Sequence, residues 1–167
     1  MKAIILAAGT SSRLYPITLE YPKCLLPFGE KTLIEHQISW LNLCGIDDIL
    51  VVHGYLHHII EEKLGSIVRY RFYEKFAETN NLYTLHSVKD ELDDDVVILF
   101  SDVLLSVKLL QKCVNSAEDF CLIVDKKNIS DTTMFVSIKN GKIYDIGSHI
   151  ALKEADGNFI GVAKFSK

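Results

Sequence analysis

The chain has 167 residues, of which 49% are hydrophobic and 24% are charged, and its formal net charge is −4 at pH 7. These values predict a single globular domain over residues 1–167 with a substantial core. The negative charge argues against a general nucleic-acid binder, and no apolar run has the length of a membrane span. The four cysteines lack CxxC spacing, which is typical of reduced thiols in a cytoplasmic protein.

Along the chain, uninterrupted apolar runs alternate with segments in which apolar residues recur every three or four positions. The first pattern predicts strands, of which the first is expected to be parallel and buried, and the second pattern predicts helices. The expected strands are 2–7, 48–53, 68–73, 96–100, 120–125 and 158–165. The expected helices are 32–44, 56–64, a helix capped by Asn81 that runs to about Leu92, and 107–114. Thr32 and Glu35 have the spacing of a capping box at the start of the first helix.

The segments 134–138 and 142–146 are predicted to form a β-hairpin, because the intervening Asn140-Gly141 favours a type I′ turn. The alternation of strands and helices elsewhere predicts an α/β fold. We expect a Rossmann-like, mainly parallel mixed sheet that is flanked by helices and joined by right-handed crossovers. The hairpin would be an antiparallel addition to this sheet.

Residues 6–27 read LAAGTSSRLYPITLEYPKCLLP and form the most informative segment of the chain. Gly9 and the small residues after it can bring backbone N–H groups onto an anion at the carboxyl end of the first strand, where Arg13 and Lys23 can neutralise it. The segment lacks both the GK[ST] of a Walker loop and the GxGxxG of a dinucleotide fingerprint. It therefore predicts a polyphosphate site of another kind.

The order LAAG-x-x-[ST]-R-L-x-P-x-T followed by PK-x-L resembles the nucleotidyltransferases that join a nucleoside triphosphate to a phosphorylated small molecule. The resemblance implies a glycosyltransferase-A-like (GT-A-like) fold. It also implies two catalytic residues: Arg13 on the β- and γ-phosphates, and Lys23 between the α-phosphate and the attacking phosphate. The implied nucleotide site consists of Leu6, Ala7, Ala8, Gly9, Thr10, Ser11, Ser12, Arg13 and Lys23. Ser11 stands where the family usually has a second glycine, so a positive φ would strain it, or its hydroxyl would donate to a phosphate.

Asp102 follows the apolar run 96–100 and should emerge beside the first loop at the carboxyl edge of the sheet. A carboxylate suits Mg²⁺, which takes few protein ligands and otherwise prefers phosphate oxygens and water. In the resembled family an aspartate at this place binds magnesium, so Mg²⁺ is the expected cofactor, Asp102 its ligand, and Ser101 part of the nucleotide site. The alternative is that Asp102 caps the following helix. A second metal-binding aspartate is not identifiable; Asp145 and Asp156 read as hairpin or loop residues.

The stretch Asn80-Asn81-Leu82-Tyr83 resembles the cytidylyltransferases that activate phosphocholine or small phosphonates. Helix capping explains one asparagine without any further role. The second leaves room for a hydrogen bond to the base or the substrate, so Asn80 and Asn81 are both candidate nucleotide-binding residues. Hexose-1-phosphate nucleotidyltransferases typically have a different stretch in this region.

Together these features predict a magnesium-dependent enzyme that transfers CMP from CTP to a small phosphorylated acceptor and releases pyrophosphate. The resemblance places such enzymes in the synthesis of cell-surface polymers and implies neither a nucleic-acid nor a membrane partner. The alternatives are a sugar-1-phosphate nucleotidyltransferase that uses UTP, dTTP or GTP, and a non-catalytic nucleotide-binding module. The ending GVAKFSK resembles the middle of these proteins. We therefore expect a missing C-terminal segment, and nucleotide binding with slow turnover.

Overall fold

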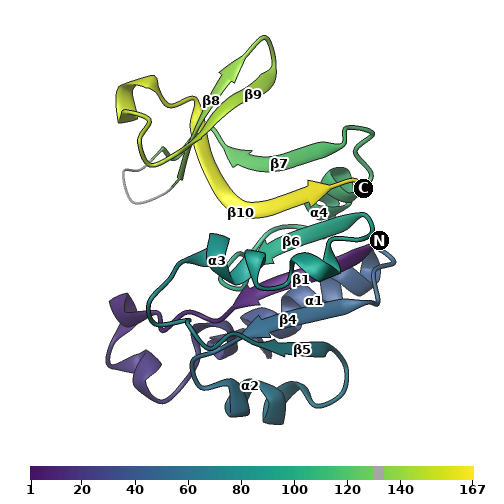
Figure 1. The fold of residues 1–167 in the computed structure, drawn as a ribbon, viewed down its shortest axis with the longest axis vertical. Coiled ribbons are helices and arrows are strands. Elements are labelled where there is room, and N and C mark those ends of the chain that lie inside the picture. The colour runs from purple at the N-terminus through teal and green to yellow at the C-terminus, as the bar shows by residue number, and fades with distance from the viewer. Residues whose placement is uncertain (130–133) are drawn as a thin grey trace.

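A mixed sheet of parallel and antiparallel strands runs through the molecule, and the computed structural model describes residues 1–129 and 134–167 of it. The strands follow the order β5-β4-β1-β6-β10-β8-β9, and β7 pairs with β10. The parallel strands are β1 (Lys2–Ala7), β4 (Ile49–His53), β5 (Arg69–Phe72) and β6 (Val96–Phe100). The antiparallel strands are β7 (Phe120–Asp125), β8 (Met134–Lys139), β9 (Lys142–Gly147) and β10 (Gly157–Phe165). Figure 1 shows β8 and β9 projecting beyond β10, away from the parallel strands.

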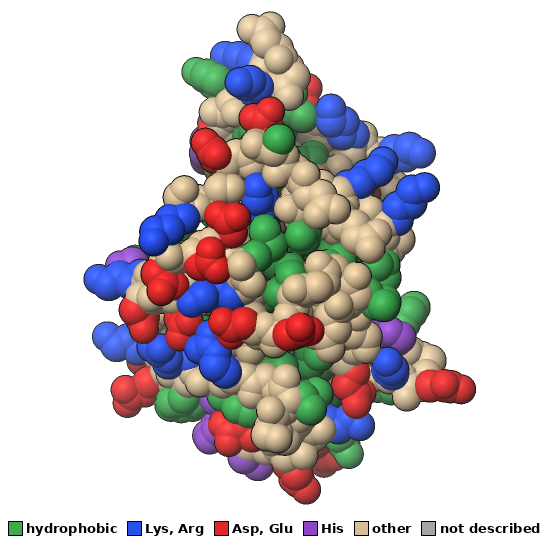
Figure 2. Space-filling view, turned by 90° about the vertical axis from the view of Figure 1, so that its right-hand side faces the viewer, with side chains coloured by type: hydrophobic (Ala, Val, Ile, Leu, Met, Phe, Trp, Pro, Cys, Tyr) green, Lys and Arg blue, Asp and Glu red, His purple; other side chains and the backbone are tan. Residues whose placement is uncertain are grey.

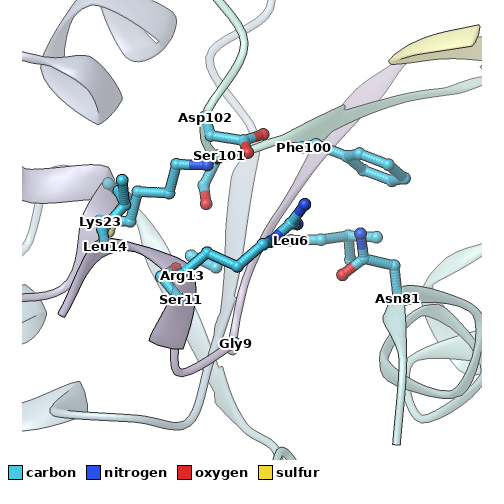
Figure 3. Close-up of a pocket in the computed structure, with 12 residues that line it drawn as sticks. Leu6, Gly9, Ser11, Arg13, Leu14, Lys23, Asn81, Phe100, Ser101 and Asp102 are labelled. Atoms are coloured by element: carbon cyan, nitrogen blue, oxygen red, sulfur yellow. Dashed lines mark hydrogen bonds and ion pairs between the residues drawn. The ribbon is translucent and has the colours of Figure 1, made fainter. Parts of the chain in front are cut away.

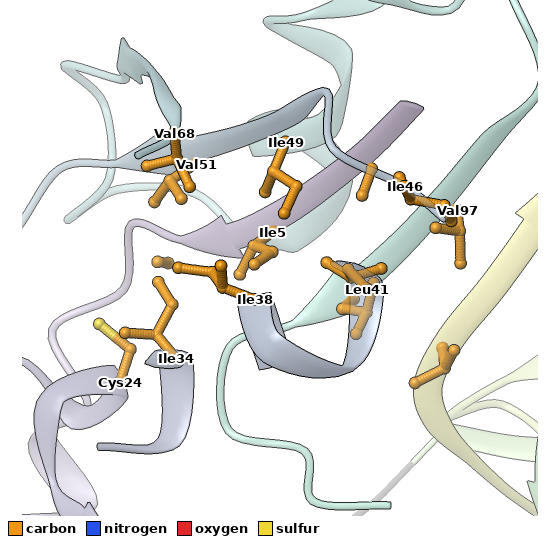
Figure 4. Close-up of a cluster of buried hydrophobic side chains, with 14 of the residues drawn as sticks. Ile5, Cys24, Ile34, Ile38, Leu41, Ile46, Ile49, Val51, Val68 and Val97 are labelled. Atoms are coloured by element: carbon orange, nitrogen blue, oxygen red, sulfur yellow. The ribbon is translucent and has the colours of Figure 1, made fainter. Parts of the chain in front are cut away.

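Helices cover both faces of the parallel half of the sheet. Successive side chains of a strand point to opposite faces, so Ala3, Ile5 and Ala7 of β1 belong to one hydrophobic cluster, and Ile4 and Leu6 belong to the other. The larger cluster is covered by α1 (Leu33–Leu43), α2 (His57–Leu64) and α4 (Val107–Val114). Figure 4 shows the side chains of α1 packed against those of β1 and β4. The predicted α/β class is confirmed, with α3 (Asn81–His86) beside the smaller cluster.

The boundaries of α1 follow from its sequence. Thr32 accepts a hydrogen bond from the Glu35 N–H, and the Glu35 carboxylate accepts one from the Thr32 N–H at 2.8 Å, so the predicted capping box is present. The apolar stripe of α1 is interrupted by a single buried polar residue, Gln37. Gly45, which follows the helix at φ 77, adopts a backbone conformation that glycine takes without strain.

The helix predicted to begin at Asn81 and to run to about Leu92 is shorter than expected. Asn80 is the N-cap, because its side chain accepts a hydrogen bond from the Leu82 N–H at 3.0 Å, and α3 ends at His86. A separate 3-10 helix, Lys89–Glu91, follows it. The break has a tertiary cause, because Glu91 is held by cations on two separate strands, β1 and β5.

An ion-pair network surrounds Glu91 at the edge of the sheet where the parallel strands begin. Arg69 of β5 donates to both Glu91 carboxylate oxygens, at 2.9 and 3.0 Å, and also to Asp48 at 2.9 Å. Lys2 of β1 binds Glu91 at 3.3 Å and Asp93 at 2.8 Å. Hydrogen bonds from Arg69, followed by those from Lys2, lower the pKa of Glu91 to about 2. Figure 2 shows acidic and basic side chains interspersed on the side of the molecule that carries both termini.

The predicted hairpin is confirmed. Strands β8 and β9 pair antiparallel, and Asn140 and Gly141 between them have φ values of 51° and 75°, as both central residues of a type I′ turn require. A second, smaller hairpin pairs β2 (Pro27–Phe28) with β3 (Lys31–Thr32). The sequence analysis did not anticipate it, because strands of two residues are too short to show a hydrophobic period. None of the described helices is long and apolar enough to cross a membrane.

Candidate functional site

The carboxyl ends of β1 and β6 meet at one edge of the sheet, opposite the ion-pair network. The two strands are parallel neighbours, and the Ser101 N–H donates to the Leu6 carbonyl at 3.2 Å just beyond their paired segments. The loop after β1 and the turn after β6 therefore lie side by side. Open α/β sheets bind ligands at such an edge.

A cavity of ≈ 210 Å³ opens between this loop and this turn (Figure 3). Most of the residues that the sequence analysis assigned to the site line it: Leu6, Ala7, Gly9, Ser11, Arg13, Lys23, Asn81, Ser101 and Asp102. Four do not: Ala8, Thr10, Ser12 and Asn80. Leu14, Cys24 and Phe100 line it without having been predicted. Their apolar character gave no signal that would have separated them from core residues.

The loop after β1 has an unusual backbone at Ser11, whose φ is 53°. The sequence analysis considered what a positive φ would mean at this position, and Ser11 does adopt one, which is more costly for serine than for glycine. The carbonyl of Ser11 accepts hydrogen bonds from the Thr18 hydroxyl at 2.9 Å and from the Leu14 N–H at 3.0 Å. Thr18 is fully buried, and its hydrogen bond restrains the backbone of Ser11. A Cβ added at Gly9 would meet nothing within 4 Å, which leaves space beside the loop for a ligand.

Two cations and one carboxylate face the cavity. Lys23 begins the 3-10 helix Lys23–Leu25, and its Nζ lies 2.5 Å from Oδ2 of Asp102. Figure 3 shows Arg13 extending from the loop toward the interior of the cavity. The alternative interpretation of Asp102 as a helix cap is wrong, because α4 is capped by the Ser106 side chain, which accepts from the Leu109 N–H. Asp102 is thus left for the cavity, where two cations and one carboxylate favour an anionic ligand.

Other ionisable groups at this edge do not supply chemistry. Burial raises the pKa of Cys24 to about 12, so its thiol is neutral near pH 7 and is no nucleophile. Asp145 and Asp156, the candidates for a second metal ligand, do not line this cavity. His149 lies 2.9 Å from Asp145, and Asp156 accepts a hydrogen bond from the Ile138 N–H at 2.6 Å. Asp145 lies on β9, and Asp156 directly precedes β10.

The fit of the site to Mg²⁺ rests on Asp102. Within residues 1–129 and 134–167, no three His, Cys, Asp or Glu side chains are placed to hold a metal ion together. Asp102 is 39% exposed and faces a cavity suited to an anion. Mg²⁺ commonly keeps several waters and is bound through one or two carboxylates plus substrate phosphates. The donor set therefore fits an ion that arrives with a phosphate ligand, and does not fit a closed protein cage.

Comparisons with known proteins identify the family to which the chain belongs. The profile of the family named "Nucleotidyl transferase" matches residues 2–144. The chain belongs to this family, and the resemblance found from the sequence is confirmed.

Two relatives are cytidylyltransferases. The chain is 32% identical over 185 residues to CTP:phosphoglutamine cytidylyltransferase from Campylobacter jejuni, and the match covers 99% of this chain and 73% of the relative. It is 48% identical over 101 residues to choline-phosphate cytidylyltransferase from Streptococcus pneumoniae, with 59% of this chain and 43% of the relative covered. Among solved structures, a Bacillus anthracis protein described as a glucose-1-phosphate thymidylyltransferase superposes with a TM-score of 0.86 at 27% identity, covering 99% of this chain and 71% of that one.

Proposed function

We propose that this protein transfers CMP from CTP to a small phosphorylated acceptor and releases pyrophosphate. One observation carries the proposal: Arg13, Lys23 and Asp102 come from three separate segments and line one cavity at the carboxyl ends of β1 and β6. The choice of CTP is supported by the names of the two cytidylyltransferase relatives.

In the proposed reaction, a phosphate or phosphonate oxygen of the acceptor attacks the α-phosphorus of CTP. A new P–O bond forms, the bond from the α-phosphorus to the bridging oxygen breaks, and pyrophosphate leaves with the electron pair. The acceptor is already anionic at neutral pH, so no general base is required. The protein must instead align the reactants and neutralise the charge that develops on the oxygens.

Each charged residue then has a distinct role. The guanidinium of Arg13 can hold two oxygens of the departing pyrophosphate in a fork, whereas the ammonium of Lys23 is a mobile point charge that suits the α-phosphate and the attacking oxygen. Asp102 would hold Mg²⁺ together with phosphate oxygens and water, and the ion would neutralise charge on the triphosphate. In the absence of nucleotide, the ammonium of Lys23 neutralises Asp102.

A sugar-1-phosphate nucleotidyltransferase is the second candidate, and the overall likeness to the Bacillus anthracis protein favours it. A non-catalytic nucleotide-binding module is the third, and the strained Ser11 favours it. Against the latter, Arg13, Lys23 and Asp102 are all present and all face the cavity. The four cysteines are free thiols, which supports a reducing compartment and hence the cytoplasm.

A pyrophosphate-release screen tests the proposal. CTP, UTP, dTTP and GTP are each combined with a phosphorylated amine, a small phosphonate and a sugar 1-phosphate, with Mg²⁺ or with EDTA. We expect release with CTP and an amine or phosphonate acceptor, only when Mg²⁺ is present. Release with UTP or dTTP and the sugar 1-phosphate would establish the second candidate instead.

Calorimetric titration of the nucleotides separates binding from turnover. CTP should bind more tightly than UTP or GTP, because a wrong base leaves buried polar groups unpaired at about 1–3 kcal/mol each. Nucleotide binding without release under any condition would support the non-catalytic module. Equal affinity for CTP, UTP and GTP would contradict the choice of CTP.

A further inference from the structure

The turn that carries Asp102 is braced from beneath by a side chain of α1. Phe100, Ser101, Asp102 and Val103 form a tight turn at the end of β6, in which the Val103 N–H donates to the Phe100 carbonyl at 3.2 Å. The side-chain amide of Gln37 donates to both ends of this turn, to the Phe100 carbonyl at 2.9 Å and to the Val103 carbonyl at 2.8 Å. Asp102 thus lies within a segment whose two ends are held by one side chain.

The orientation of the Gln37 amide is fixed by these partners. Both neighbouring atoms are carbonyl oxygens, which can only accept hydrogen bonds, so the NH₂ group must face them. Gln37 itself is fully buried between α1 and the sheet. Its rotation is therefore restricted by packing as well as by two hydrogen bonds.

The apolar stripe of α1 gives no reason for a glutamine at this position. The neighbouring positions of the stripe are Leu33, Ile34, Ile38 and Leu41, and all of them are buried and apolar. Within the described residues, Oε1 of Gln37 has no hydrogen-bond partner. A buried polar atom left without a partner is unfavourable, so packing within the helix stripe does not account for the glutamine. The feature that the glutamine does provide is the pair of hydrogen bonds to the Asp102 turn.

We propose that Gln37 is a positioning residue: it fixes the turn of residues 100–103 so that the Asp102 carboxylate faces the cavity. This inference rests on the proposed function, in which Asp102 holds Mg²⁺ with the nucleotide. Gln37 does not line the cavity, and within the described residues its side chain makes no hydrogen bond to the loop after β1. Its hydrogen bonds therefore act on the metal side of the proposed site.

Substitution of Gln37 by methionine tests the proposal, because methionine has a similar length and volume but donates no hydrogen bond. Ile38→Val is the matched control. It removes one buried methyl group from the same helix, and an isoleucine side chain forms no hydrogen bond to the turn. The Kd of CTP is measured for each protein by calorimetry, once with Mg²⁺ and once with EDTA. Initial rates of pyrophosphate release give kcat and KM for the same proteins.

We expect the Kd in EDTA to be unchanged in Gln37→Met, because the anion-binding loop is intact. The gain in affinity that Mg²⁺ provides should fall on the order of tenfold, as it does when groups that orient metal ligands are removed. The value of kcat should fall by a similar factor, whereas Ile38→Val should match the wild type in all three quantities. A merely structural role for Gln37 would lower stability without separating the two Kd values.

Hydrogen exchange provides a readout that requires neither metal nor activity. In the metal-free protein, the amides of residues 101–103 should exchange faster in Gln37→Met than in Ile38→Val, because the turn has lost its brace. Exchange at residues 9–13 should be the same in both. Gln37→Leu is a second variant in case the methionine protein does not fold.

The outcomes distinguish this inference from the proposed function. If the wild type shows no strengthening of CTP binding by Mg²⁺, the proposed function fails and this inference fails with it. If the wild type shows the strengthening and Gln37→Met retains it in full, only the inference is overturned. If neither Gln37→Met nor Gln37→Leu folds, the residue is needed for the fold itself and the positioning role is refuted.

Discussion

Replacing Lys23 by methionine should separate catalysis from stability, because the structure predicts very different costs for the two. The Lys23 ammonium lies 2.5 Å from the Asp102 carboxylate, and the side chains are 30% and 39% exposed. An ion pair that is this accessible to water contributes about 0.2–1 kcal/mol to folding. For a domain of this size the melting temperature should therefore fall by no more than about 4 °C.

The expected cost to the reaction is far larger. Loss of one group that stabilises developing charge in a preorganised site typically lowers kcat on the order of 10²–10³-fold, which corresponds to about 2.7–4 kcal/mol. The proposed position of Lys23, between the α-phosphate and the attacking oxygen, is of this kind. Its effect should therefore appear in kcat at saturating CTP.

Lys63→Met is the matched control for this measurement. Lys63 is also a partly exposed lysine paired with a carboxylate, since its Nζ lies 3.3 Å from Glu35, but it is not part of the cavity. Pyrophosphate release and thermal melting are compared for the wild type and both variants. If Lys23→Met loses no more activity than Lys63→Met, the catalytic role of Lys23 is wrong.

Three further changes test other parts of the structure. Asp102→Asn should keep the metal-free affinity for CTP and remove its strengthening by Mg²⁺ in calorimetry, because the neutral amide is a poor partner for a hard dication; persistent strengthening would count against metal ligation. Ser11→Gly should raise the free energy of unfolding in urea by up to about 1 kcal/mol, because glycine relieves the positive φ at a smaller cost in chain entropy; a loss of stability would mean that the Ser11 side chain is needed. Glu91 has its pKa lowered from 4.5 to about 2, so its contribution to stability is present above pH 4.5 and is lost as the pH falls toward 2. The melting temperature of Glu91→Gln should therefore fall less steeply across that interval than that of the wild type, and parallel slopes would refute the role of Glu91 in acid unfolding.

The elements that were predicted correctly are those whose formation depends on residues close together in the sequence. The strand 2–7 matches β1 because an uninterrupted apolar run fits a parallel strand that is buried on both faces. The hairpin turn was predicted because Asn140 and Gly141 tolerate positive φ. The predicted end of α3 was wrong. The segment Lys89–Glu91 is held by Arg69 and Lys2, which are distant in the sequence, and no local pattern reveals that they lie close to it.

In the candidate site, too, some residues could be predicted from the sequence and others could not. The loop after β1 and Asp102 were found from the sequence because strand ends in an α/β sheet converge on one edge. Asn80 was assigned to the nucleotide, but its side chain caps α3, and only Asn81 lines the cavity. Gln37 was missed, although a lone polar residue in the apolar stripe of a helix was a visible signal. Its partners lie more than sixty positions away, so only the fold could identify them.

The place of β10 in the sheet has a consequence for synthesis on the ribosome. Every residue that lines the candidate cavity lies between Leu6 and Asp102, so the cavity can begin to assemble while the rest of the chain is still emerging. The outer edge of β6, however, pairs with Val162–Phe165 of β10, the last of the described strands to be made. Until then the apolar strand VVILF presents an unpaired edge, which is the kind of surface that other chains can join. The nascent protein therefore exposes an edge that other chains can join, close to the candidate site, until residues 162–165 have been made.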